Sequence, residues 1–387
     1  MERKYPKEFW IMCGGALFFF LSFNIILPEL SNFLKSLGGQ KHLGWIIPAF
    51  SISALLARPL SGWITDNLGR KWSMIGGCVF CIIAGVFYPM VGTVTSFFIV
   101  RAIHGFSTGF TPTGFTAFTA DTIKPEFRGR AMGWQGTFNN IGTSFGYGLG
   151  ALIVIYINVN ALFIASAIFA VIALILFSML PETMPSEAAR KFQFNLKSLF
   201  YLPAWKPAFL MFLVCISLGS ILTIMPDYTI ELGYKNKGLY LTIYISFSLI
   251  FRMFSGGISD AWGRAYSIAI GTFSQIISLI LLILNPFQYS FFISAFFYGV
   301  GQGFNAPSLF AWASDTATAE NRGKALASLF MMLEFGIIFG GYFAGKMTMQ
   351  WGMKATDVFT MNASFFVIAF IFSVYSIIKS AKTAENN

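Results

Sequence analysis

Two polar segments of the chain carry the same chemical groups at the same spacing. RPLSGWITDNLGRK spans residues 58–71, and RMFSGGISDAWGRA begins 194 residues later and spans 252–265, with seven of fourteen residues identical. A carboxylate and a guanidinium four residues apart can form an ion pair that opens and closes. Each copy holds one such pair: Asp66 with Arg70, and Asp260 with Arg264.

A duplicated ion pair beside duplicated glycines predicts a latch, by which we mean a contact that closes the cytoplasmic face in one state and releases it in another. The glycines would allow close helix approach, the aspartates would sit at helix starts, and the arginines would pair across the two halves of the chain. Alternatively, the charges only enforce topology and loop solubility, although that leaves the repeated Gly and Asp unexplained. The remaining members of the motif are Gly62, Gly69, Lys71, Gly256 and Gly263.

Ionisable residues inside apolar segments are functional candidates, because a charge there costs several kcal/mol unless it faces a cavity or a partner. Glu334 lies in LFMMLEFGIIFGGYF, about nine residues and so roughly 14 Å from the cytoplasmic end of its helix. The same offset of 194 places Asn140 opposite it in the first half. We expect Glu334 to bind and release a proton; the alternative is a protonated Glu bonded to an amide or carbonyl.

Arg101 and His104, in VRAIHGFSTGF, are three residues apart and therefore share a helix face. The residue equivalent to Arg101 in the second half is Ala295, so this arginine is not duplicated. That asymmetry favours proton coupling or an anionic substrate group, against an ion pair or a side chain that reaches the outer surface.

Other polar residues could line a path through the molecule. Glu29 and Asp227 each follow a proline at the outer end of an equivalent segment, where they could form an outer gate or a solvated helix end. Candidate cavity-lining residues are Asn24, Asn139, Gln302, Asn305, Tyr240 and Tyr244.

The elements that position these residues must be membrane-spanning helices. The chain of 387 residues is 56% hydrophobic and 11% charged, and apolar runs of about 20 residues recur with short polar breaks. Strands of an outer-membrane barrel would be about half that length. We predict an all-α membrane protein with 12 spans: 9–29, 44–64, 72–91, 96–118, 131–154, 160–180, 207–228, 239–258, 266–284, 290–313, 325–345 and 357–378.

Lys and Arg mark alternate loops. With these spans, 17 fall on the side of both termini and six on the other side. The positive-inside rule therefore predicts cytoplasmic termini, with the bacterial inner membrane as the expected location. We predict a first six-helix half over 1–180, a cytoplasmic loop over 181–206 and a second half over 207–387. Because the basic residues form no single patch, we expect no nucleic-acid partner.

The pattern G-x-x-x-D-x-x-G-R-K at residues 62–71 resembles the signature of the major facilitator superfamily, and the resemblance covers essentially the whole chain. The second copy departs from it by ending in Ala265. The resemblance implies two parallel six-helix halves that rock around a midplane site. It also implies that the motif Asp and Arg residues stabilise the outward-open state. DTIKPEFRGR and DTATAENRGK, five of ten residues identical, then supply the opposing parts of each latch: Asp121 and Arg128, and Asp315 and Arg322.

Two further patterns bear on the branch of the family. R-x-x-x-G at Arg101 to Gly105 resembles a fourth-helix motif whose Arg is linked to proton coupling in antiporters. GTSFGYGLGAL, from Gly142, resembles the fifth-helix motif of the antiporter branch, with Tyr147 in place of its Pro.

We predict a secondary transporter rather than an enzyme, since the chain has two histidines, no H-E-x-x-H and no nucleophile elbow. The first hypothesis is proton-coupled export of small amphiphilic compounds by a monomer, with no cofactor beyond the proton gradient. The alternative is a carrier of a sugar, organic acid or chelate in which Arg101 binds an anionic group. A non-transporting sensor is disfavoured because the loops are too short for a signalling domain.

Overall fold

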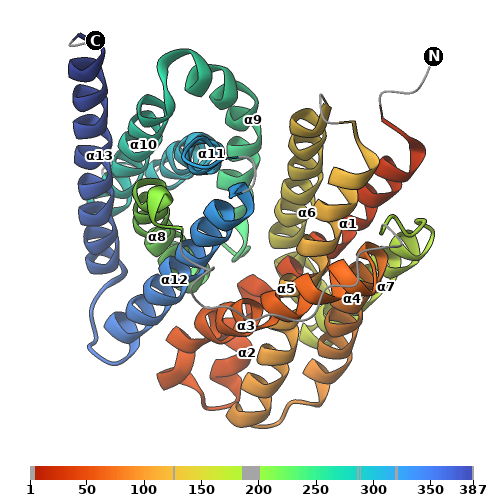
Figure 1. The fold of residues 1–387 in the computed structure, drawn as a ribbon. Coiled ribbons are helices and arrows are strands. Elements are labelled where there is room, and N and C mark those ends of the chain that lie inside the picture. The colour runs from red at the N-terminus through yellow and green to blue at the C-terminus, as the bar shows by residue number, and fades with distance from the viewer. Residues whose placement is uncertain are drawn as a thin grey trace. The chain divides into compact units, whose positions relative to one another are not determined.

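The computed structural model describes residues 5–124, 127–184, 201–285, 287, 289–318 and 321–385, with backbone alone at 129, 322, 323 and 380–385. The described residues form twelve long helices (Figure 1). Nine segments among them are long and apolar enough to cross a bilayer. The predicted helical membrane architecture is therefore confirmed. The long helices are α1 (Lys7–Ile25), α3 (Ile46–Asn67), α4 (Arg70–Phe87), α5 (Val94–Thr122), α6 (Arg128–Tyr156), α7 (Val159–Ser178), α8 (Trp205–Glu231), α9 (Leu239–Trp262), α10 (Arg264–Leu284), α11 (Ser290–Asp315), α12 (Arg322–Met349) and α13 (Ala355–Glu385).

Shorter elements fill the turns: η1 (Leu27–Glu29), α2 (Leu30–Ser36), η2 (Gln40–Trp45), η3 (Tyr88–Met90) and η6 (Leu202–Ala204). By contacts the chain divides into two compact units. The first unit holds α1 to α7 and the segment Gly233–Leu239. The second unit holds α8 to α13 and the segment Lys41–Pro48, which precedes most of α3 in sequence. The predicted loop between the halves includes residues 185–200, which lie outside the described part of the chain, so its boundaries stay a prediction.

The two units use the same helix pairs. In the first unit α1 packs against α6, and α4 packs against α5 and α7. In the second unit α8 packs against α12, and α10 packs against α11 and α13. These pairs consist of helices that are equivalent by the sequence repeat. The sequence duplication therefore extends to the packing of the helices.

Repeated glycines explain how neighbouring helices come so close. A Cβ atom at Gly105 would lie 2.4 Å from the carbonyl oxygen of Phe50, which brings α5 against α3. At the equivalent Gly299 a Cβ atom would lie 2.4 Å from the carbonyl oxygen of Tyr244, which brings α11 against α9. Small residues at such crossings let backbones pack directly in a membrane protein.

The latch motif forms the turn between two helices in each unit. Gly69 precedes α4 with φ 128°, and Gly263 precedes α10 with φ 102°, values that side-chain-bearing residues rarely adopt. Because these turns need a positive φ, the second glycine of the motif recurs at a fixed spacing.

One prediction about the motif is wrong. Asp66 and Asp260 lie in the last turns of α3 and α9, not at helix starts, because the chain turns only at the following glycine. Within its own unit, a Cβ atom at Gly62 or Gly256 would meet no atom within 4 Å, and close helix approach at these two glycines stays a prediction.

Candidate functional site

The first latch motif is an ion-pair network built by α3, α4 and α5. The Arg70 guanidinium donates from Nε to Asp121 at 2.8 Å, and a second nitrogen donates to the carbonyl oxygen of Thr65 at 2.6 Å and lies 3.5 Å from Asp66. One guanidinium thus joins the end of α3 to the end of α5.

A carboxylate that the sequence analysis missed completes this network. Glu182, just after α7, accepts hydrogen bonds from the backbone N–H groups of Arg70 at 2.9 Å and Lys71 at 3.2 Å. The Lys71 ammonium donates to the carbonyl oxygen of Ser178 at 2.6 Å, and the Thr183 hydroxyl donates to Asp121 at 3.1 Å. A carboxylate at the first N–H groups of α4 is favourable because these groups have no partner within the helix. The sequence does hold a signal for Glu182, since this acidic residue closely follows the end of an apolar segment.

The second motif repeats the network within the second unit. The Arg264 guanidinium donates from Nε to Asp315 at 2.8 Å, pairs with Asp260, and donates to the Ser259 hydroxyl at 3.1 Å. Arg70 and Arg264 therefore contact residues at equivalent positions, each within its own unit, although Arg70 binds the carbonyl oxygen of Thr65 and Arg264 binds the hydroxyl of Ser259.

The other expected latch residues behave differently. Arg128 donates to the carbonyl oxygen of Ile123 at 3.1 Å, which ties the start of α6 to the end of α5. The side chain of Arg322 lies outside the described part of the chain. Pairing of latch residues across the two halves stays a prediction.

Arg101 and His104 lie together on α5, inside the first unit. The Arg101 side chain is 2% exposed, and its guanidinium carbon lies 4.3 Å from the ring centroid of Phe50. His104 is fully buried, with its ring edge-on to Phe50 and Tyr88, and neither ring nitrogen has a hydrogen-bond partner among the described residues.

Tyr88 of η3 is a second member of this site that the sequence analysis missed. It is fully buried, its ring stacks on Phe163 at 4.7 Å, and the same ring lies edge-on to His104. The Phe50 ring faces the buried Arg101 guanidinium, an arrangement that cation–π attraction stabilises.

Glu334 lies on α12 and is 7% exposed, near the Cys215 thiol of α8. In the first unit Asn139 and Asn140 lie half-buried on α6. The side-chain oxygen Oδ1 of Asn139 and the side-chain nitrogen Nδ2 of Asn140 have no hydrogen-bond partner among the described residues. That Glu334 and Asn140 face one cavity stays a prediction.

Several candidate cavity residues take part in helix packing. Asn24 on α1 donates to Thr143 of α6 at 3.2 Å, and the fully buried Asn305 on α11 donates to Gln275 of α10 at 2.6 Å. Gln302, also on α11, is half-buried.

The two tyrosines of α9 are buried as well. The Tyr240 hydroxyl shares a 2.9 Å hydrogen bond with Ser294 of α11, and the Tyr244 ring lies edge-on to Tyr298. A role of these side chains in a transport path stays a prediction.

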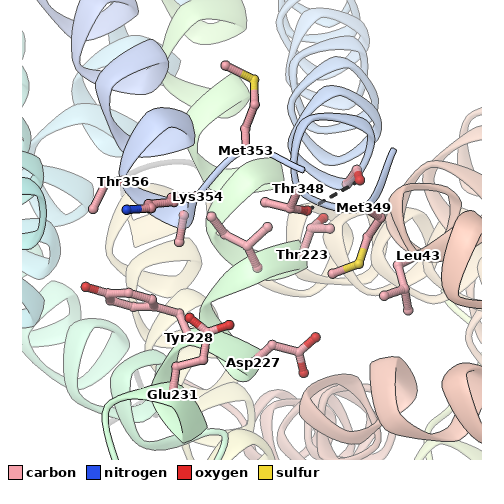
Figure 2. Close-up of a pocket in the computed structure, with 13 residues that line it drawn as sticks. Leu43, Thr223, Asp227, Tyr228, Glu231, Thr348, Met349, Met353, Lys354 and Thr356 are labelled. Atoms are coloured by element: carbon pink, nitrogen blue, oxygen red, sulfur yellow. Dashed lines mark hydrogen bonds between the residues drawn. The ribbon is translucent and has the colours of Figure 1, made fainter. Parts of the chain in front are cut away.

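Asp227 lines a cavity of about 370 Å³ in the second unit, whereas Glu29 is buried in η1 of the first. The cavity lies between the end of α8, the end of α12 and the start of α13 (Figure 2). Its polar lining residues include Glu231, one helical turn beyond Asp227, and Lys354, neither of which the sequence analysis proposed.

Comparison with known proteins identifies the family. The sequence model of the Major Facilitator Superfamily matches residues 12–259 and 208–387. The chain is 23% identical to the quinolone resistance protein NorA of Staphylococcus aureus (strain MSSA476), over 88% of this chain and 90% of that protein. It is 27% identical to multidrug resistance protein 1 of Bacillus subtilis (strain 168), over 55% and 56% of the two chains.

Solved structures share the fold. The human organic anion transporter MFSD10 (TETRAN) superposes with a TM-score of 0.75 at 18% identity, covering 95% of this chain and 100% of that one. A D-xylose-proton symporter superposes with a TM-score of 0.75 at 16% identity, covering 94% and 96%. This chain is therefore an integral membrane transporter, and no enzyme, of the major facilitator superfamily.

Proposed function

We propose that the protein exports small amphiphilic organic compounds by alternating access and that proton movement drives the export. The observation that carries this proposal is the duplicated network around Arg70 and Arg264, which gives both units the same helix-to-helix tie. Breaking and remaking such exposed ion pairs costs about 1 kcal/mol or less each, so they suit a contact that must open in every cycle.

The relatives support export of drug-like compounds. NorA is named for quinolone resistance, and the Bacillus protein for multidrug resistance. Resistance to drugs, in a transporter of this family, fits export of organic compounds along a path lined by side chains on many helices.

We propose that Glu334 takes part in proton coupling. Arg101 and His104, which lie together on α5, are the other candidates for this role. Glu334 is buried on α12, and an ionisable side chain on a membrane-spanning helix is costly unless it faces a cavity or a partner. Arg101 supplies a fixed positive charge in the other unit.

A second candidate is a carrier of an anionic metabolite, favoured by that same unduplicated Arg101. In that case the guanidinium binds a carboxylate or phosphate of the substrate and no proton moves.

The test is transport into everted proteoliposomes with an imposed pH gradient, using a panel of dyes, antibiotics, organic acids and sugars. We expect uptake of one or more amphiphilic compounds that an uncoupler abolishes. Uptake of an organic acid or sugar that is insensitive to the uncoupler would favour the metabolite carrier.

A further inference from the structure

The starts of α1 and α6 form an aromatic surface on the first unit. The two helices pack against each other, and at their starts the ring centroids of Trp10 and Trp134 lie 5.8 Å apart, edge to face. The two side chains remain 39% and 47% exposed. Two tryptophans from different helices are therefore held together at the surface of the protein.

A basic residue lies one helical turn before each tryptophan. Lys7 is three residues before Trp10 on α1, and Arg130 is four residues before Trp134 on α6. Residues at these spacings share a helix face. Both basic side chains are exposed, whereas Glu8, the acidic residue in the first turn of α1, is half-buried. This surface thus carries two positive charges about 5 Å along the helices from a pair of rings.

The order of these groups matches that of a phospholipid. Tryptophan rings in membrane proteins lie at the level of the lipid headgroups, and exposed Lys and Arg residues beside them attract anionic lipids. Phe145, eleven residues after Trp134, lies on the same face of α6 and is 58% exposed. The surface therefore continues from charge through aromatic rings to an apolar stretch that an acyl chain can cover.

The second unit keeps one of the charges without the aromatic pair. The offset of 194 residues makes Lys324 equivalent to Arg130, and Ser328 equivalent to Trp134. Lys324 is exposed, but Ser328 is fully buried and accepts a hydrogen bond from the backbone N–H of Tyr201. The basic residue thus belongs to the repeated sequence, whereas the tryptophan belongs to the first unit alone.

We propose that Lys7, Trp10, Arg130 and Trp134 form a binding site for an anionic phospholipid in the leaflet beside the amino terminus. The two cations bind the phosphate of the headgroup, the rings pack against the glycerol region, and an acyl chain lies along α6. The occupant is a membrane lipid because the chain is an integral membrane protein and the rings lie close to the start of a span that begins at Lys7. The proposal depends neither on the transported compound nor on proton coupling.

The experiment measures contact between lipids and tryptophans by fluorescence quenching. The full chain is placed in phosphatidylcholine nanodiscs that contain a minor fraction of either phosphatidylglycerol or phosphatidylcholine, brominated near the top of the acyl chain. The quenching that a Trp10→Phe, Trp134→Phe variant loses reports on these two of the nine tryptophans. We expect this part to be at least about twofold greater with brominated phosphatidylglycerol than with brominated phosphatidylcholine at equal mole fraction.

Matched variants connect the lipid preference to the two cations. Lys7→Gln combined with Arg130→Gln should bring the ratio of quenching by the two lipids close to one, whereas Lys324→Gln should leave it unchanged. The charge-conserving exchange Lys7→Arg with Arg130→Lys should keep the ratio, which separates loss of charge from a disturbed fold. Millimolar inorganic phosphate should not compete, because it has no acyl chain to bury.

Equal quenching of the tryptophan pair by both lipids would overturn the proposal. So would a preference that survives Lys7→Gln with Arg130→Gln, or one that Lys324→Gln abolishes equally. Competition by inorganic phosphate would identify a site for free anions instead of a lipid. Quenching by neither lipid would mean that another molecule, such as a second copy of the chain, covers the rings, and it would equally contradict the lipid site.

Discussion

Arg101 lies buried on α5, against the ring of Phe50. A guanidinium in such a place either serves the transported species or only fills space between aromatic side chains. Its charge and its shape can be changed separately, so the two roles are distinguishable.

We predict that Arg101→Lys keeps more transport than Arg101→Met, because lysine retains the charge and methionine retains only the apolar stem. The methionine variant should lose at least about tenfold in transport rate, equivalent to 1.4 kcal/mol. Uptake in proteoliposomes, normalised to protein in monodisperse form, measures this. Equal or better transport by Arg101→Met would identify the arginine as a packing residue.

At the scale of elements, tight helix contacts at glycines hold each unit together. A Cβ atom at Gly142 of α6 would lie 2.2 Å from the carbonyl oxygen of Leu17 on α1, whereas Gly133 on the same helix has open space beside it.

Gly142→Ala should therefore destabilise the protein by about 1–3 kcal/mol through overpacking. Gly133→Ala should be neutral or stabilising by up to about 1 kcal/mol, since alanine is the better helix former. Thermal unfolding followed by size-exclusion chromatography compares them. Equal melting temperatures for the two variants would contradict the packing account.

The two latch turns provide a second matched pair. Gly69 and Gly263 both have positive φ, but a Cβ atom at Gly69 would also lie 2.1 Å from the Glu182 carboxylate, while Gly263 has open space. We expect Gly69→Ala to lower the melting temperature more than Gly263→Ala. Combining Gly69→Ala with Glu182→Ala should give less destabilisation than the two single changes predict, because they share one contact.

The elements themselves were predictable from sequence, and their contacts were not. Apolar runs predicted every long helix, although α5 continues to Thr122, beyond the expected residue 118. In this last part of α5 the Thr119 hydroxyl donates to the carbonyl oxygen of Phe115, one turn back. Glu182 reaches α4 across 112 residues of chain, and such a contact leaves no periodic signal in the sequence.

For the whole molecule, the duplication of motifs, helix pairs and glycines indicates two equivalent halves. The distribution of Lys and Arg over their loops, with 17 on one side and six on the other, predicts the orientation in the membrane.

We predict that green fluorescent protein fused after Asn387 is fluorescent and that alkaline phosphatase fused there is inactive. Phosphatase fused after Lys235, between α8 and α9, should be active, because that loop lies on the opposite side. The reverse pattern of activities would contradict the positive-inside assignment.

Coupling of substrate and proton movement is the central claim for the whole molecule, and Glu334→Gln tests it most directly. The measurement is the pH inside proteoliposomes that carry a pH dye, challenged with a transported compound, alongside exchange of the labelled compound at equal pH. We predict that the wild type shows a substrate-triggered pH change and that Glu334→Gln loses it while retaining exchange. Labelled compound crossing with no pH change in the wild type, and a variant that behaves identically, would contradict the account.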